Sequence, residues 1–436
     1  MPVEPLGSTT KGNRLHIGFY GRTNVGKSSF INYLAAQQVS ITSPVPGTTT
    51  DIVEKAMEIL PLGPVLLIDT AGLDDETILG RLRKERTIES LSRVDVAVLV
   101  VEADSWGDTE EWAVEAFRKK GIPYMVVVNK IDQKKPSDNF FELIKPYLYK
   151  LPKADSDRPE SYAYMEASSL DHSRDDYRKK FKEILIKIAP DDFVNNPPLL
   201  ADLLPAGSHV VFVVPIDLQA PKGRLILPQV QAIREALDAD AMVSVVKERE
   251  LPAFLERLKE KPRLIVCDSQ VVNRVVADVP EGVLFTTFSI LFARNKGDLI
   301  EYAKGAAHIV SLKPGDRVLI AEACTHHPIE DDIGRVKIPR WLRQYVGGDL
   351  VIENLGGRSW AKNLSIYDLV IHCGGCMLNR RAMLNRISEA REAGVPITNY
   401  GVAISFLQGV LEKALSPFPS AYLAFKKELE KIKTKA

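Results

Sequence analysis

Two sets of residues in this chain have types and spacings that could support chemistry, one set toward each end. In the second half, Cys324 and His326 follow one apolar run, and His372, Cys373 and Cys376 follow another. Thiolate sulfur and imidazole nitrogen at such spacing are typical metal ligands, and a Cys-x-x-Cys pair can also perform thiol–disulfide exchange. The first half instead carries glycine, lysine, serine and aspartate at the ends of apolar runs, which suits binding of phosphate and Mg²⁺.

The segment after the apolar run LHIGFY has the order strand, glycine-rich loop and helix that a phosphate-binding loop requires. Its glycines let backbone N–H groups converge on phosphates, and the following helix N-terminus adds partial positive charge. Lys27 would reach the β- and γ-phosphates and act in catalysis, while Ser28 would bind Mg²⁺. The residues expected to contact nucleotide here are Gly21, Asn24, Val25, Gly26, Lys27, Ser28 and Ser29.

Two more apolar runs end in residues that complete a guanine-nucleotide site. The run VLLID ends at Asp69, whose carboxylate can hold Mg²⁺ through water, and the amide of Gly72 can sense the γ-phosphate. The run YMVVV leads into Asn129, Lys130 and Asp132. The Asp132 carboxylate can accept two N–H bonds from guanine, a pattern that adenine does not offer. The sequence therefore predicts GTP rather than ATP.

Two loops are expected to close this site. The segment PVPGTTTD contains Thr48 and Thr49, of which Thr49 is the better candidate to close over Mg²⁺ and the γ-phosphate. Ser168 and Ser169 follow the run YAYMEA where a guanine-contacting loop would lie, although an ordinary loop explains two serines nearly as well. Leu73 follows the Asp-x-x-Gly element in place of the glutamine that often orients water, so we expect slow intrinsic hydrolysis.

The elements that position these residues follow an α/β pattern. Short apolar runs alternate with charged segments of helical period along the chain, which is typical of largely parallel sheets. We expect a P-loop GTPase domain over 1–190, a linker over 191–207 rich in proline and asparagine, and two smaller parallel-sheet α/β domains over 208–285 and 286–436.

Composition narrows the class of protein further. The 436 residues include 57 Lys plus Arg and 57 Asp plus Glu, so no global field favours nucleic acid or a membrane surface. The apolar runs are shorter than the ~20 residues of a spanning helix, and the N-terminus lacks an apolar signal region. We therefore expect a cytoplasmic protein. Four cysteines in such a chain do not form a disulfide framework, so the late cysteines point to chemistry.

The late cysteines leave several chemistries open. Both ligand sets follow the expected carboxyl ends of strands, where ligand crevices form in open parallel sheets, so they can meet at one site. A zinc site, a redox pair of Cys373 and Cys376, and an exchangeable iron–sulfur cluster all fit the residues. His326 and His372 are each explained equally well as ligands or as structural residues.

Other residues near these motifs have plainer interpretations. Glu330, Asp331 and Asp332 could supply an oxygen ligand, but an acidic helix start or a solvated turn explains them better. Cys267, in the run LIVCD, is expected to be a small buried hydrophobic residue.

The first 170 residues resemble the Era and MnmE branch of the TRAFAC GTPases, notably in GRTNVGKSS, PGTTTD and DTAGLDD. In potassium-stimulated members of that branch, an asparagine in the phosphate loop helps to hold a K⁺ ion that stands in for an arginine finger, and Asn24 matches it. The resemblance implies K⁺-stimulated GTP hydrolysis. The alternative is that Asn24 only stabilises the loop through side-chain hydrogen bonds.

The whole chain is similar to the family of FeFe-hydrogenase maturation GTPases, HydF. That family joins such a GTPase domain, through a middle dimerisation domain, to a domain with Cys-x-His and His-Cys-x-x-Cys motifs. The resemblance implies a 4Fe-4S cluster on Cys324, Cys373 and Cys376, with the fourth iron left to a histidine, another weak ligand or an incoming diiron unit. It also implies a homodimer formed through 208–285 and a cluster-binding domain over 286–436.

The resemblance further implies a role as a scaffold or carrier. Such a protein receives a diiron precursor with carbonyl and cyanide ligands from the radical-SAM maturases HydE and HydG, and delivers it to apo-FeFe-hydrogenase. The alternative is a zinc-stabilised regulatory or tRNA-modification-linked GTPase. The neutral net charge and the lack of a basic, aromatic-rich stripe count against a link to RNA.

Overall fold

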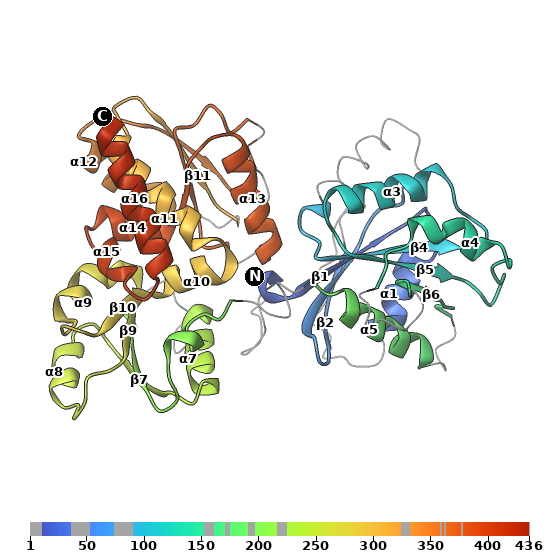
Figure 1. The fold of residues 1–436 in the computed structure, drawn as a ribbon, viewed down its shortest axis with the longest axis horizontal. Coiled ribbons are helices and arrows are strands. Elements are labelled where there is room, and N and C mark those ends of the chain that lie inside the picture. The colour runs from blue at the N-terminus through green and yellow to red at the C-terminus, as the bar shows by residue number, and fades with distance from the viewer. Residues whose placement is uncertain are drawn as a thin grey trace. The chain divides into compact units, whose positions relative to one another are not determined.

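The computed structural model divides the chain into two compact units, Met1–Asn196 and Pro197–Ala436, which we consider separately (Figure 1). The residues that the structure describes are 11–35, 53–73, 90–151, 161–170, 175–190, 197–215, 225–323, 332–357, 360–361, 363–375 and 378–435.

The first unit is built on a six-stranded sheet of order β2-β3-β1-β4-β5-β6, in which β2 is antiparallel to β3 and the other neighbours are parallel. Its strands are β1 Leu15–Tyr20, β2 Val53–Ile59, β3 Gly63–Asp69, β4 Val96–Glu102, β5 Tyr124–Asn129 and β6 Tyr164–Glu166. Its helices are η1 Lys11–Asn13, α1 Lys27–Ala35, α3 Asp108–Lys119, α4 Phe140–Ile144, η2 Lys145–Tyr147 and α5 Asp176–Ile188.

Helices cover both faces of this sheet, which explains the continuous apolar runs of its central strands. Phe30 of α1 and Phe181 of α5 pack on one face, and Phe117 of α3 and Phe140 of α4 pack on the other. A parallel strand buried on both faces has no polar face to display, so it reads as a continuous run rather than as an alternating one.

The second unit contains two smaller sheets, each four-stranded and parallel throughout, with orders β10-β9-β7-β8 and β12-β11-β13-β14. The strands are β7 His209–Val213, β8 Met242–Val246, β9 Leu264–Cys267, β10 Leu284–Thr287, β11 Arg317–Ala321, β12 Val351–Leu355, β13 Leu369–His372 and β14 Ile397–Asn399. The helices are η3 Ala201–Leu203, α7 Leu227–Asp238, α8 Leu251–Glu256, η4 Ser269–Val271, α9 Val272–Asp278, α10 Phe288–Lys296, α11 Leu299–Ala307, η5 His308–Ser311, η6 Ile333–Lys337, α12 Ile338–Val346, α13 Arg380–Glu392, α14 Tyr400–Leu407, α15 Leu411–Ala414 and α16 Pro419–Lys435.

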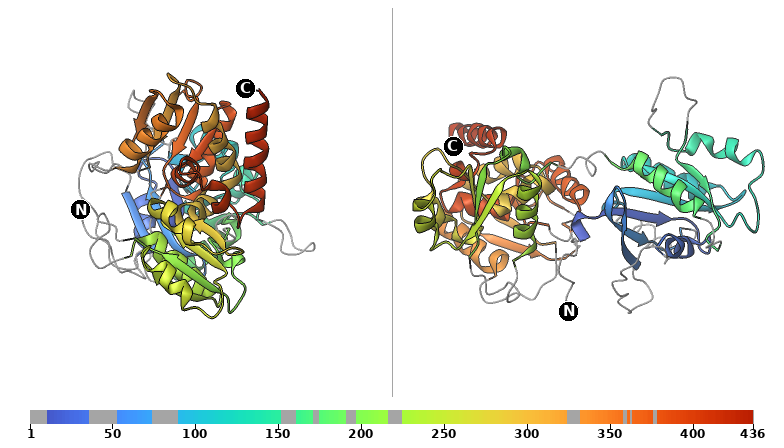
Figure 2. Two further views of the ribbon diagram at one scale, coloured as in Figure 1. Left: turned by 90° about the vertical axis from the view of Figure 1, so that its left-hand side faces the viewer. Right: turned by 90° about the horizontal axis from the view of Figure 1, so that it is seen from below.

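The two small sheets share one hydrophobic core. A single cluster of buried side chains contains Phe212 and Phe285 of the second sheet together with Leu319 and Val370 of the third. The helices of this unit surround both sheets, as the views in Figure 2 show. Helix α11 approaches β14 so closely that a Cβ atom on Gly305 would lie 1.9 Å from the Ile397 carbonyl oxygen, so only glycine fits there.

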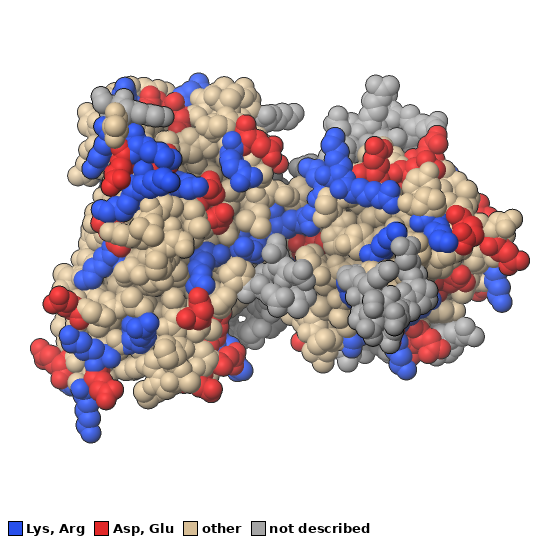
Figure 3. Space-filling view, in the orientation of Figure 1, with Lys and Arg blue, Asp and Glu red and all other residues tan. Residues whose placement is uncertain are grey.

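The α/β prediction is confirmed: a P-loop type mixed sheet is followed by two all-parallel sheets. On the face that Figure 3 shows, acidic and basic side chains are interspersed over both units. Within the described part of the chain, no helix is both long and apolar enough to cross a membrane.

Candidate nucleotide and thiolate sites

The loop between β1 and α1 has the backbone conformation of a phosphate-binding loop. Gly21, Asn24 and Gly26 have φ values of +143°, +64° and +92°, in the region that favours glycine and tolerates asparagine. A Cβ atom at Gly21 would lie 2.2 Å from the Val100 carbonyl oxygen, and one at Gly26 would lie 2.3 Å from Nδ2 of Asn129. Both glycines are therefore required by backbone conformation and by packing.

The side chains that follow the loop fit a nucleotide with Mg²⁺. The Nζ atom of Lys27 donates hydrogen bonds to the carbonyl oxygens of Gly21, at 3.1 Å, and Arg22, at 2.8 Å. Ser28 Oγ lies 2.5 Å from Oδ2 of Asp69. The other Asp69 oxygen, Oδ1, is buried and has no hydrogen-bond partner within the described residues. A buried carboxylate oxygen without a hydrogen-bond partner is typical of a ligand-binding position. The oxygen atoms of Ser28 and Asp69 suit Mg²⁺ and its bound water.

Asn129 joins three loops of the predicted site. Its side chain is fully buried, and its Nδ2 atom donates to the Val25 carbonyl oxygen at 3.0 Å and lies 3.3 Å from Ser169 Oγ. Its Oδ1 atom accepts the N–H of Ser169 at 3.1 Å. Lys130 Nζ donates to the Asn24 carbonyl oxygen at 2.6 Å. The phosphate loop, the Asn-Lys-x-Asp segment and the serine loop thus form one hydrogen-bonded assembly.

The remaining predicted nucleotide residues surround this assembly. Asp132 follows Asn129 and Lys130 in the sequence and is exposed, so its carboxylate is accessible to a guanine base. Ser168 is buried. The backbone N–H of Leu73, which follows Gly72, donates to the Gly21 carbonyl oxygen at 3.2 Å and so places the Asp-x-x-Gly segment beside the phosphate loop. Thr48 and Thr49 lie outside the described residues. Ser29 is exposed on the first turn of α1.

One contact at this site was not predictable from local sequence. Arg22 of the phosphate loop forms two hydrogen bonds of 2.7 Å with Glu110 on α3, and Glu110 is almost fully buried. The two residues are 88 positions apart, and neither belongs to a motif that would pair them. The pair fixes the phosphate loop against the start of α3.

In the third sheet, the two strands that lead into the thiol motifs lie side by side. Strands β11 and β13 are parallel neighbours, with Ala321 opposite His372. The sulfur of Cys373 lies 3.1 Å from the backbone N–H nitrogen of Ala323 and 3.4 Å from that of Gly375. Two backbone donors stabilise a thiolate. Cys324 comes directly after Ala323, so the chain that leads into Cys324 contacts the Cys373 sulfur.

The structure describes only some of the other residues predicted at this site. Cys324, His326, Glu330, Asp331 and Cys376 lie outside the described residues. Asp332 is buried, and its side chain accepts the N–H of Arg335 at 2.8 Å at the start of η6, which confirms its interpretation as a helix start. Cys267 is fully buried, as expected, and this burial raises the pKa of its thiol.

The side chain of His372 is fully buried, with both ring nitrogens in hydrogen bonds. Its Nε2 atom lies 2.7 Å from Nη1 of Arg386, and its Nδ1 atom lies 2.7 Å from the Cys373 carbonyl oxygen. Because arginine only donates, Nε2 accepts and Nδ1 carries the proton. Burial and the Arg386 charge lower the pKa of His372 to about 3, so the ring is neutral.

The surroundings of Cys373 fit a thiolate-bound metal group. Helix α13 begins directly after the glycine-rich loop, with the Asn379 side chain accepting the N–H of Ala382 at 3.1 Å. Lys296 is buried, and its Nζ atom lies 3.4 Å from the Gly375 carbonyl oxygen. Backbone donors and buried cations around a half-exposed sulfur favour negative charge at this place.

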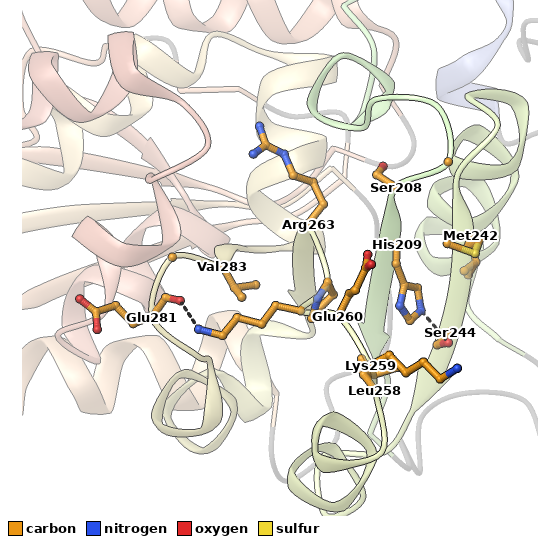
Figure 4. A pocket seen from close by; sticks show the side chains of 15 residues that line it. Ser208, His209, Met242, Ser244, Leu258, Lys259, Glu260, Arg263, Glu281 and Val283 are labelled. Carbon is orange, nitrogen blue, oxygen red and sulfur yellow. Dashed lines mark hydrogen bonds between the residues drawn. The ribbon is translucent and has the colours of Figure 1, made fainter.

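A hollow lies at the amino ends of the strands of the second sheet (Figure 4). Within it, His209 Nε2 lies 2.9 Å from Ser244 Oγ, and Lys261 Nζ donates to the Glu281 carbonyl oxygen at 3.2 Å. No residue that the sequence singled out lines it, and we assign it no function.

Comparisons with protein families cover most of the chain. The family model described as "Hydrogen maturase F dimerization domain" matches residues 199–297, and the one described as "Hydrogen maturase F tetramerization domain" matches residues 300–417. The model "50S ribosome-binding GTPase" matches residues 16–130. The chain belongs to the hydrogen maturase F family. The GTPase domain of this hydrogen maturase F chain supports hydrolysis of GTP to GDP, and its dimerization and tetramerization domains support self-association.

Curated relatives are similar to part of this hydrogen maturase F chain. The tRNA modification GTPase MnmE of Caldicellulosiruptor saccharolyticus is 39% identical over 128 residues, which cover 28% of this chain and 27% of that protein. The GTPase Era of Xanthomonas axonopodis pv. citri is 35% identical over 130 residues, or 29% of this chain and 43% of that protein. The chain thus spans less than half the length of the curated relatives it matches.

Among solved structures, Era of Aquifex aeolicus bound to GDP and aluminium fluoride is similar at 22% identity and a TM-score of 0.30, covering 55% of this chain and 97% of that one.

Proposed function

We propose that this hydrogen maturase F protein is a GTP-hydrolysing scaffold that binds a 4Fe-4S cluster and carries a diiron precursor to apo-FeFe-hydrogenase. One observation supports the cluster site most strongly. The Cys373 sulfur lies at the joined carboxyl ends of β11 and β13, held by N–H groups of the residue before Cys324 and of the loop that leads to Cys376.

Three thiolates, from Cys324, Cys373 and Cys376, would hold the cluster. Three protein ligands leave one iron with an exchangeable position, which is the chemistry that a carrier needs. His326 remains a candidate for this fourth position. His372 is the weaker candidate, because both of its ring nitrogens are already in hydrogen bonds. The cargo would be a diiron unit with carbonyl and cyanide ligands, made by HydE and HydG.

In the GTPase domain, the roles follow from the positions of the side chains. Lys27 would contact the β- and γ-phosphates, and Gly72 would respond to the γ-phosphate. Ser28, Thr49 and Asp69 would hold Mg²⁺, with Thr48 beside Thr49 in the switch loop. The guanine base would bind at Asp132, supported by Asn129, Lys130, Ser168 and Ser169.

Delivery of cargo can be measured directly. The protein is co-expressed with HydE and HydG, purified without oxygen and mixed with apo-FeFe-hydrogenase, and hydrogen evolution is then followed. We expect activation by the wild-type protein and none by the Cys373→Ala variant. An iron-loaded wild-type protein that leaves the hydrogenase inactive would exclude the carrier role.

GTP hydrolysis is expected to be slow and stimulated by K⁺. The side chain of Asn24 is exposed and forms no hydrogen bond within the described residues, which leaves its carboxamide oxygen free for an ion. Its φ of +64° offers a competing explanation, since asparagine tolerates this conformation.

The Asn24→Gly variant separates these explanations, because glycine keeps the backbone conformation and removes the carboxamide. We expect the rate of hydrolysis by the wild type to rise about tenfold or more when K⁺ replaces Na⁺, because a single electrostatic contact to the transition state has an effect of at least this size. This rise should disappear in Asn24→Gly. Phosphate release at equal ionic strength is the measurement. Unchanged K⁺ stimulation in the variant would assign Asn24 to the backbone alone.

Self-association through the second sheet is expected to use β8. This strand is at the edge of its sheet, and its residues Met242 and Val245 are 59% and 45% exposed. An open apolar edge strand is a site where another chain can pair. We expect Met242→Lys to weaken the dimer about tenfold, as loss of a central interface contact does, measured by sedimentation. The Leu60→Lys variant, which changes an exposed leucine of the GTPase domain, should leave the dimer intact.

A further inference from the structure

Arg386, on α13, is a buried cation near the thiolate site, and the part of the chain that the structure describes holds no buried carboxylate partner for it. Only 7% of the residue is exposed. Its guanidinium lies 4.8 Å above the Trp360 ring and donates to Nε2 of His372 at 2.7 Å. Within the described residues no carboxylate forms an ion pair with it, and the acidic side chain that acts on it, Glu389, is exposed.

An arrangement of this kind is unfavourable unless a negative charge lies close by. Removing a guanidinium from water costs free energy that neutral hydrogen bonds do not offset. The His372 ring accepts at Nε2 and donates at Nδ1, as a neutral imidazole does, and an aromatic ring compensates only part of a charge. Hydrogen bonds through His372 connect this guanidinium to Cys373, the described thiol of the site.

Given the proposed cluster site, we propose that Arg386 supplies the counter-charge of the thiolate-bound cluster and that His372 positions Arg386 rather than binding iron. Hydrogen bonds connect Arg386 to Cys373 through His372. Arg386 contacts His372 Nε2, and His372 Nδ1 donates to the carbonyl oxygen of Cys373 itself. A ligand role would require one ring nitrogen of His372 to lose its present partner.

This role has a consequence that packing alone would not produce. Reduction adds a negative charge to a cluster that three thiolates already make anionic, and a fixed cation nearby favours that reduced state. Removal of the Arg386 charge should therefore shift the midpoint potential to more negative values. Lys296, at the end of α10, is a second buried cation whose Nζ atom lies 3.4 Å from the Gly375 carbonyl oxygen, and it would keep part of the effect in such a variant.

The test compares cluster midpoint potentials by EPR-monitored redox titration of the reconstituted full-length protein. Arg386→Gln removes the charge, Arg386→Lys keeps it, and Arg391→Gln removes an exposed charge from the same helix. We expect a more negative potential in Arg386→Gln, and values near the wild type in the other two. Iron loss in Arg386→Gln with iron retained in Arg386→Lys supports the same role.

Equal potentials in Arg386→Gln and the wild type, or equal iron loss in the Gln and Lys variants, would overturn the proposal. The His372→Gln variant provides a second test, by its midpoint potential and by the g-values of the reduced cluster. We expect it to shift the potential in the same direction as Arg386→Gln with unchanged g-values of the reduced cluster, whereas changed g-values would assign His372 to iron. A wild-type protein that binds no iron would instead refute the cluster site itself.

Discussion

The Asp132→Asn substitution is expected to weaken GTP binding by about 10²- to 10⁴-fold and to create affinity for xanthosine triphosphate. The Asp132 carboxylate would accept two N–H bonds from guanine, and hydrogen bonds to a charged group contribute about 1.5–3 kcal/mol each. Their loss therefore amounts to roughly 3–6 kcal/mol, at about 1.4 kcal/mol per tenfold. An asparagine N–H can donate to the carbonyl that xanthine carries in place of the guanine amine.

Dissociation constants for both nucleotides, measured by fluorescence titration, check this expectation. Asp138→Asn is a matched control, because Asp138 is an exposed aspartate a few residues further along the same loop. It should bind GTP as the wild type does. Retention of wild-type GTP affinity by Asp132→Asn would mean that the base binds elsewhere.

The second large effect is expected at the thiolate site. Cys373→Ala should lower the iron content of the anaerobically reconstituted protein from about four atoms per chain to less than one. Two remaining cysteine ligands are too few to hold the cluster. GTP affinity should not change, because the GTPase residues belong to the other unit. Iron and acid-labile sulfide analysis gives the measurement.

Cys267→Ala is the matched control for this loss. Cys267 ends β9 of the second sheet and is fully buried, whereas Cys373 is half-buried beyond β13 of the third sheet. The control variant should retain its iron. If both variants lost iron to the same extent, the loss would reflect damage to the fold and not ligation by Cys373.

Much of the fold and of the nucleotide site was predictable because strand-end motifs obey a simple rule. Parallel strands end at one edge of a sheet, so Asp69 at the end of β3 and Asn129 at the end of β5 had to approach the loop after β1. The same rule brought Ala323 and Cys373 together after β11 and β13. The residue types then indicated the chemistry.

Contacts between elements distant in sequence were not predictable in this way. The spacing of the sequence does not show that Asn129 joins Val25 to Ser169, because the choice of partner depends on how the loops pack. His372 is the clearest case. Its place in the motif indicated either a ligand or a structural residue, and its hydrogen bond to Arg386, fourteen residues away, favours the second. The roles of Thr49, Cys324 and Cys376 stay predictions.

The central claim is tested most directly by the metal content of the wild-type protein. After anaerobic reconstitution, iron, sulfide and zinc are measured, and an EPR spectrum is recorded after reduction with dithionite. We predict about four irons and a matching amount of sulfide per chain, with the signal of a reduced cluster. Stoichiometric zinc without iron would contradict the scaffold function and leave a GTPase whose late cysteines hold a structural metal.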